Sequence, residues 1–276
     1  MRLASLVLLL VASSACARDH WPEPPPVDPA EYQTEYAAWR AERQETIAST
    51  LPIVGIWALE EGDTPYGGGA FTRRGEDVTF VPASGTPAPL TFGEGITLDT
   101  IHLELTGAED GRLWVMGSDT AHPAVKNPPP AQTYPLDSRW RVAARFDAFE
   151  TPRPVKVPDV RGGVMDFDAV GQLVFRLDGE EARLTAFGFP DVPFFFVMFK
   201  DPTNQSTTYQ GYRILRPAKV APGEFTVVDF NLALNPPCAF SKYTVCPTPP
   251  RENRLQVAIE AGEKRLPSAD GYAPSS

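Results

Sequence analysis

The sequence of 276 residues lacks any run of five or more basic residues and any long transmembrane segment. Its 25 Lys and Arg residues are outnumbered by 35 Asp and Glu residues, which gives a formal net charge of −10. Because nucleic acid and anionic lipid are bound by clustered Lys and Arg, neither is expected as a partner. No segment reaches the roughly 18 consecutive apolar residues of a membrane-spanning helix, so a polytopic membrane protein is not expected.

Histidine and cysteine are scarce, with three residues of each type. The histidines (His20, His102 and His122) all lie before residue 123, far from the two later cysteines. A structural zinc ion needs four nitrogen or sulfur ligands, so no metal is expected. The motifs G-x-S-x-G and H-E-x-x-H, the P-loop and the dinucleotide fingerprint are also missing. The familiar enzyme classes are therefore unsupported, and no cofactor is expected.

The N-terminus predicts export. Residues 1–15 combine an early positive charge at Arg2, a short apolar run and small residues before Cys16, as in a signal peptide. The small residues before Cys16 resemble a lipoprotein cleavage box, although Ser13 stands where that box usually has leucine. We expect Cys16 to be lipidated and the protein to be held in the cell envelope by this anchor. The alternative is an ordinary soluble export signal.

A proline-rich segment and one helix follow. Residues 16–28 hold four prolines, with a fifth at Pro29, and predict an extended tether. Asp28, Pro29 and Glu31 fit an N-cap, a first-turn proline and a capping box, which predicts an amphipathic helix from Pro29. Its expected apolar stripe consists of Tyr32, Tyr36, Trp39, Ile47 and Leu51.

After Pro52, short segments of alternating polarity between Gly, Pro, Asp and Asn predict an all-β fold of two lobes, sandwich or barrel-like. The helix and first lobe are assigned to residues 29–121, a linker to 122–136, the second lobe to 137–266 and a flexible tail to 267–276. The expected strands are Val54–Leu59, Val78–Val81, Ile96–Leu105, Leu113–Met116, Trp140–Phe146, Leu173–Leu177, Leu184–Phe187, Phe194–Phe199, Gly211–Leu215, Phe225–Phe230 and Leu255–Ile259.

Specific motifs appear only in the second lobe. They are Asp-Pro-Thr-Asn at 201–204, Tyr-Gln-Gly-Tyr-Arg at 209–213, Asp-Phe-Asn at 229–231, Asn-Pro-Pro-Cys-Ala-Phe at 235–240, Cys-Pro at 246–247 and Glu-Asn-Arg-Leu at 252–255. With these motifs the chain resembles DUF1684, a family of unknown function. Leu234 stands where the family pattern has an aromatic residue, and residues 210–212 replace a more glycine-rich stretch. The resemblance implies that the second half of the chain is a domain of this family. It implies no activity, because the family has no established one.

Cys238 and Cys246 lie eight positions apart after two prolines. In an exported protein this spacing favours a disulfide, with about 2.5 kcal/mol of stabilisation on the chain-entropy model. The alternative, a nucleophilic Cys238, needs a base nearby.

The candidate ligand-binding residues are Tyr209, Arg213, Asp229, Asn231, Asn253 and Glu260. We expect them to form a groove in the second lobe that binds a small molecule or short peptide. A hydrolase-like enzyme using Asp229 and Glu260, or Cys238, is the first alternative; a membrane-tethered scaffold without a pocket is the second. For single residues a structural role is also open: Arg213 or Arg145 would pair with Asp229, and the asparagines would bind backbone groups.

Overall fold

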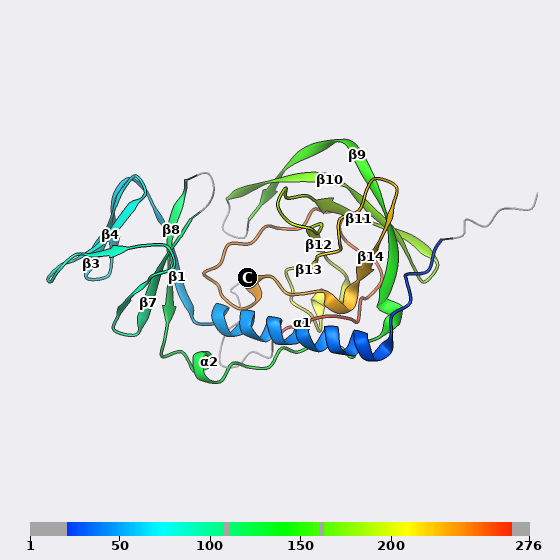
Figure 1. Cartoon of the computed structure of the whole chain (residues 1–276), viewed down its shortest axis with the longest axis horizontal. Helices are drawn as coiled ribbons and strands as arrows, with labels where there is room; N and C mark the ends of the chain where they lie inside the picture. Colours follow the sequence, from blue (N-terminus) through cyan, green and yellow to red (C-terminus); the bar gives the residue numbers. More distant parts are fainter. Residues whose placement is uncertain (1–20, 108–110, 160–162, 267–276) are drawn as a thin grey trace, which may run out of the picture.

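The computed structural model describes residues 21–107, 111–159 and 163–266 (Figure 1). The predicted signal peptide, the lipidation site Cys16 and the tail at 267–276 lie outside the described residues. The described chain is mostly β, with four sheets, which confirms the predicted β-rich character. Within the described residues, no helix has both the length and the apolar character needed to cross a membrane.

The first lobe consists of two four-stranded antiparallel sheets, ordered β1-β8-β7-β6 and β2-β3-β4-β5. Its strands are β1 (Ile53–Leu59), β2 (Gly62–Tyr66), β3 (Gly69–Arg74), β4 (Asp77–Pro82), β5 (Ala88–Leu90), β6 (Ile96–Leu98), β7 (Ile101–Gly107) and β8 (Leu113–Asp119). Both sheets contribute to one core, in which Phe71, Leu103 and Val115 are fully buried. This shared core accounts for the stability of the lobe, because each sheet alone would leave one apolar face in water.

The second lobe contains a four-stranded sheet, β11-β10-β9-β14, and the strand pair β12-β13. Its strands are β9 (Arg141–Pro158), β10 (Val164–Leu177), β11 (Glu180–Phe187), β12 (Val197–Phe199), β13 (Arg213–Leu215) and β14 (Phe225–Asp229). The second lobe also contains short 3-10 helices between its strands or next to them. They are η1 (Ser138–Trp140), η2 (Pro202–Gln205), η3 (Phe230–Leu232) and η4 (Pro237–Ala239). Phe175 and Phe199 both pack edge-on against Phe230 in the core.

Two predicted strands are wrong. Ile96–Leu105 is divided into β6 and β7 because Asp99 takes a left-handed conformation (φ 53°) and turns the chain back on itself. Leu255–Ile259 forms no strand: only the Leu255 amide bonds a neighbouring backbone, at the Lys200 carbonyl, whereas both backbone groups of Ile259 bind side chains. The Ile259 amide donates to Asp201 at 3.1 Å, and its carbonyl accepts from Arg213 at 3.0 Å.

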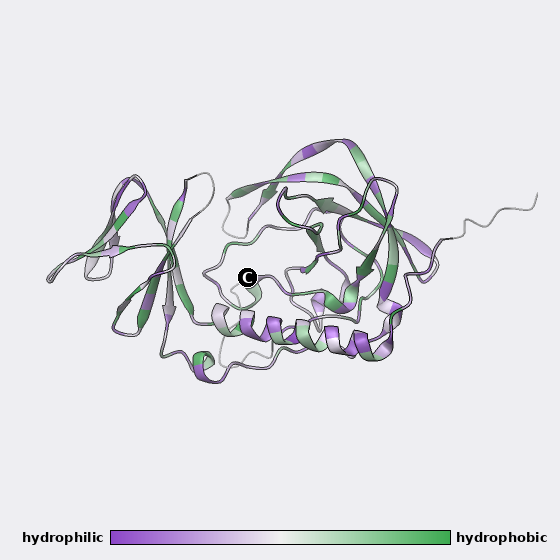
Figure 2. Cartoon of the chain, viewed as in Figure 1, coloured by the Kyte–Doolittle hydropathy of each residue, from purple (hydrophilic) through white to green (hydrophobic). Residues whose placement is uncertain are grey.

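Helix α1 (Pro29–Thr50) begins at the expected N-cap, where Asp28 accepts hydrogen bonds from the amides of Ala30 and Glu31. Figure 2 shows hydrophilic and hydrophobic residues alternating along it. The sequence predicts this helix as part of residues 29–121, with the first lobe, but it lies along the second lobe (Figure 1). Its buried side chains Tyr32 and Arg43 bind Asp229 and Glu263, both of the second lobe.

The predicted linker at 122–136 is also in contact with the second lobe. After the short helix α2 (Pro123–Lys126), Gln44 of α1 bonds both the Pro129 carbonyl and the Ala131 amide. The Tyr134 amide donates to the Gly262 carbonyl at 3.0 Å. The linker therefore runs beside α1 and its last residues belong to the second lobe.

The described part of the proline-rich segment, residues 21–28, is extended and docked. The Trp21 indole donates to the Ala143 carbonyl at 3.0 Å and packs edge-on against Phe225. Arg141 donates to the Pro25 carbonyl. These contacts hold residues 21–28 against β9 and β14, so this part of the segment is not a free spacer.

Candidate functional site

Arg213, one of the residues predicted to line the groove, is buried inside the second lobe and lines no groove there. Its side chain is fully buried and pairs with Asp201 at 2.5 Å. The guanidinium also donates to the carbonyls of Ala261 and Ile259, and it lies over the Phe199 ring. Arg213 thus connects three segments of the lobe. The prediction that it would pair with Asp229 is wrong, because its partner is Asp201.

Asn253 and Asn231 are likewise structural. Asn253 is fully buried, and it accepts from the Thr185 amide and donates to the carbonyls of Thr185 and Met198. Asn231 binds both backbone groups of Asp137. Asn253 thus binds one backbone donor and two backbone acceptors. Asn231 also donates to the side chains of Asp229 and Tyr32. Both asparagines bind backbone groups, as the structural alternative predicts.

Tyr209 and Glu260 do not join these residues around one groove. Tyr209 is half-buried, and burial raises the pKa of its phenol. Its carbonyl accepts a hydrogen bond from Asn204. Glu260 is exposed and lines no cleft that contains Asp229. The six predicted residues therefore do not form the groove that the sequence suggested.

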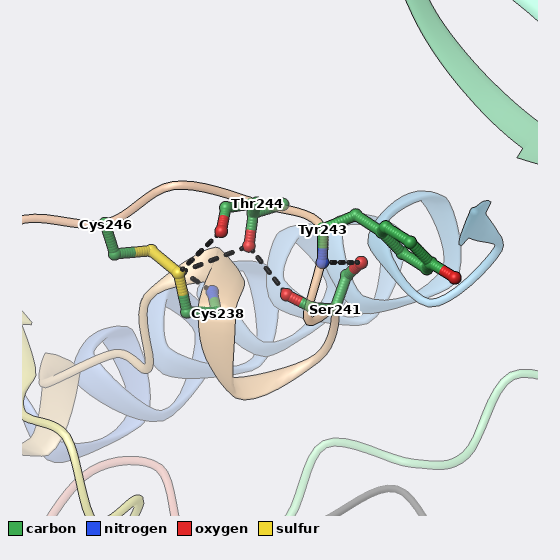
Figure 3. The surroundings of a disulfide bond; sticks show 5 residues. All are labelled: Cys238, Ser241, Tyr243, Thr244 and Cys246. Atoms are coloured by element: carbon green, nitrogen blue, oxygen red, sulfur yellow. Dashed lines mark hydrogen bonds between the residues drawn. A yellow bond between two sulfur atoms is a disulfide. The ribbon is translucent and has the colours of Figure 1, made fainter. Parts of the chain in front are cut away.

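Cys238 and Cys246 form the predicted disulfide (Figure 3). Both residues are buried, and Thr244 donates a hydrogen bond to the Cys238 sulfur at 3.3 Å. Within the same loop, Ser241 donates to the Ile53 carbonyl at the start of β1. The disulfide loop therefore contacts the first lobe, and a bonded Cys238 is no nucleophile.

A cleft of about 420 Å³ lies between α1 and the second lobe, and Asp229 lines it. The Tyr32 hydroxyl donates to one Asp229 oxygen at 2.5 Å, while the other oxygen accepts from the Asn231 amide and side chain at 3.0 Å. Asp229 is at the end of β14 and caps η3, which fixes its carboxylate toward the helix.

The walls of this cleft, called here the α1 cleft, combine apolar and charged side chains. Trp39, Leu215 and Leu234 provide an apolar surface. Its charged residues are Glu35, Glu42, Arg43, Arg141, Arg216 and Asp229. Sequence reasoning identified Asp229 but missed the others, because nothing in the helix pattern showed which lobe α1 would cover.

Tyr32 makes folding sensitive to alkaline pH. Burial, then the hydrogen bond to Asp229 and its charge, raise the Tyr32 pKa above its ordinary value of about 10. Below about pH 10 the phenol is protonated in both the folded and the unfolded chain, so Tyr32 contributes its full stabilisation. Above that pH the phenol ionises only in the unfolded chain, and the free energy of unfolding falls by up to about 1.4 kcal/mol per pH unit. We expect Tyr32→Phe to flatten the fall of unfolding free energy above pH 10 in urea titrations. Equal slopes for the variant and the wild type would contradict this assignment.

The match to a known family concerns the second lobe. The sequence model of a family described as "Protein of unknown function (DUF1684)" matches residues 130–264. The chain belongs to the DUF1684 family through these residues. An uncharacterized protein of Haloarcula marismortui, with a solution NMR structure, is 32% identical over 49% of this chain and 76% of its own, with a TM-score of 0.43. No curated protein matches the chain.

The DUF1684 match begins inside the segment predicted as a linker and ends one residue after Glu263. Helix α1 lies outside the match, yet its Arg43 pairs with Glu263 at 2.6 Å, with both side chains buried. Leu234, inside the matched residues, lines the α1 cleft. The DUF1684 domain therefore supplies one wall of this cleft, and a helix from outside the match supplies the other.

Proposed function

We propose that the protein is exported, anchored in the cell envelope through a lipid on Cys16, and binds a short peptide or similar small molecule in the α1 cleft. Signal-like residues 1–15 and the small residues before Cys16 support the export and anchoring. One observation carries the binding proposal: the cleft joins an apolar surface to charges of both signs that form no ion pair with each other.

The charges suit a ligand with two ends of opposite sign. Glu35 and Glu42 lie on α1, whereas Arg141 and Arg216 belong to the domain opposite. Within the described residues, none of these four side chains forms an ion pair within 4.0 Å. A free short peptide offers an ammonium to the glutamates and a carboxylate to the arginines, which bind carboxylates well.

The apolar part of the cleft suits an aliphatic side chain. Trp39 on α1 is half-buried and gives the accessible apolar surface, whereas Leu215 and Leu234, which are 2% and 5% exposed, form the fixed floor beneath it. The cleft volume of about 420 Å³ lies in the usual range for ligand sites. Burial of an aliphatic ligand side chain here would supply affinity, while the charges would set its orientation.

The enzyme alternative has less support. A general acid and base must face one reacting group, but Asp229 is held by Tyr32 and Asn231 while Glu260 lines no part of the cleft. Cys238 is bonded to Cys246. The scaffold alternative makes a simple prediction, because a protein without a ligand site will not bind the peptide.

Calorimetric titration of the mature chain with a free dipeptide of two leucines tests the proposal. We expect saturable binding that is at least tenfold weaker for Arg216→Gln and for the N-acetylated, C-amidated dipeptide. Arg183→Gln is the control, since Arg183 is an arginine on β11 paired with Glu181 outside the cleft. If neither peptide binds, or if both variants bind both peptides equally, the proposal is wrong.

A further inference from the structure

A second pocket, of about 500 Å³, lies where β12 ends beside η2 and the C-terminal segment. Three basic residues line it: Lys200, Arg254 and Arg265. Within the described residues, none of them forms an ion pair within 4.0 Å. A group of three unpaired basic side chains is unexpected in a chain with a net charge of −10, because acidic residues outnumber basic ones and basic side chains usually lie near them.

The backbone places two of these cations beside each other. The Lys200 amide donates to the Asn253 carbonyl at 2.9 Å, and the Leu255 amide donates to the Lys200 carbonyl at 2.8 Å. Lys200 and Arg254 therefore pair across a parallel bridge, and paired residues project to the same side of a sheet. Like charges placed opposite each other destabilise a sheet. Burial and the nearby Arg254 charge both lower the pKa of Lys200.

The acidic residue of the pocket cannot neutralise these cations. One Asp201 oxygen pairs with Arg213 at 2.5 Å, and the other accepts from the amides of Thr203 and Ile259. The Asp201 side chain is also fully buried. The side chains left to meet a ligand are the three cations and exposed amides, namely Gln205, Gln210 and Gln256.

We infer that this pocket binds the phosphate group of a soluble small molecule. A phosphate monoester carries close to two negative charges near neutral pH and three acceptor oxygens, which matches several cations with amide donors around them. Arginine binds such a group with two parallel hydrogen bonds, and lysine binds it as a point charge. A phosphate between Lys200 and Arg254 would remove the repulsion that the bridge imposes.

The source of the phosphate is soluble rather than a membrane surface. With the chain held near a membrane by the proposed lipid anchor, the net charge of −10 still opposes contact between the pocket and anionic headgroups, whereas a small phosphate ester enters the pocket without that contact. This site shares no lining residue with the α1 cleft. Peptide binding and phosphate binding can therefore fail or succeed independently.

The test measures binding of glycerol phosphate and of inorganic phosphate to the mature chain by calorimetry, with chloride at matched ionic strength in the reference. Vesicles of phosphatidylglycerol and of phosphatidylcholine form the membrane arm. We expect both soluble phosphates to bind, and neither vesicle. Arg254→Gln should weaken the binding at least tenfold, and without phosphate its melting temperature should equal or exceed that of the wild type, because the repulsion with Lys200 is gone.

Lys156→Gln is the charge-matched control, because Lys156 is an exposed lysine paired with Asp166 on β9 and β10, away from the pocket. It should bind phosphate like the wild type. Equal affinity in Arg254→Gln and the wild type, or no binding of either soluble phosphate, would overturn the inference. Binding to phosphatidylglycerol vesicles without binding of glycerol phosphate would overturn the assignment to a soluble source.

Discussion

Replacing Arg213 by methionine is expected to lower the free energy of unfolding by about 3 to 5 kcal/mol. The loss arises because Asp201 would keep a buried negative charge without its partner, and both side chains are 0% exposed. The carbonyls of Ala261 and Ile259 would lose their donor as well. Urea unfolding at neutral pH measures the difference, provided that the unfolding slope stays unchanged.

A second variant separates this structural role from simple loss of packing. Combining Arg213→Met with Asp201→Asn removes the uncompensated charge and should recover part of the stability, since an intact buried pair adds little net energy over neutral residues. Arg183→Met should cost below about 1 kcal/mol, because its pair with Glu181 is about half exposed. A loss at Arg213→Met no larger than at Arg183→Met would show that Arg213 does not hold the lobe together.

Local signals in the sequence were sufficient for several elements. Asp28 followed by Pro29 predicts where α1 begins, because the cap depends only on the next few residues. The alternation after Trp140 similarly predicts β9, although β9 extends twelve residues beyond the expected end at Phe146, to Pro158. Cys238 and Cys246 are close in sequence, so the sequence alone predicts that they can form the disulfide that the structure contains.

Partners distant in sequence could not be predicted in the same way. Arg213 is a candidate ligand-binding residue by sequence because polar residues at strand ends and in loops often serve function, but Asp201 and the carbonyls of Ile259 and Ala261 bind its two terminal nitrogens inside the lobe. The sequence did contain a signal that these two residues matter, since Asp201 and Arg213 both lie in the motifs of the second lobe. Only the fold shows that these motifs bind each other rather than a ligand.

The same limit applies to both proposed sites. Glu35 and Arg216 line one cleft although 180 positions separate them, and the side of the helix that faces the domain depends on packing. Lys200 and Arg254 become neighbours only through a bridge between two irregular segments. Neither segment has a motif for anion binding, so composition and spacing gave no indication of the pocket.

Replacing Arg43 by methionine should destabilise the protein by about 3 to 5 kcal/mol and loosen α1. Arg43 bonds Glu263 at 2.6 and 3.2 Å and the Asn235 carbonyl at 3.1 Å, and the side chains of the pair are 6% and 1% exposed. Without Arg43, Glu263 keeps the Asn235 amide as its remaining hydrogen-bond donor. Urea unfolding gives the stability, and hydrogen exchange along residues 29–50 shows whether the helix opens more often.

Arg40→Met is the matched control, because Arg40 lies one turn earlier on the same helix and is exposed. It should change the unfolding free energy by less than about 0.5 kcal/mol. Since α1 forms one wall of the α1 cleft, Arg43→Met should also weaken dipeptide binding, whereas phosphate binding at Lys200 and Arg254 should persist wherever the domain stays folded. Equal effects of the two variants on stability would mean that the buried pair with Glu263 does not hold the helix, and that the apolar contacts of Ile47 with Ala131 and Phe240 are sufficient.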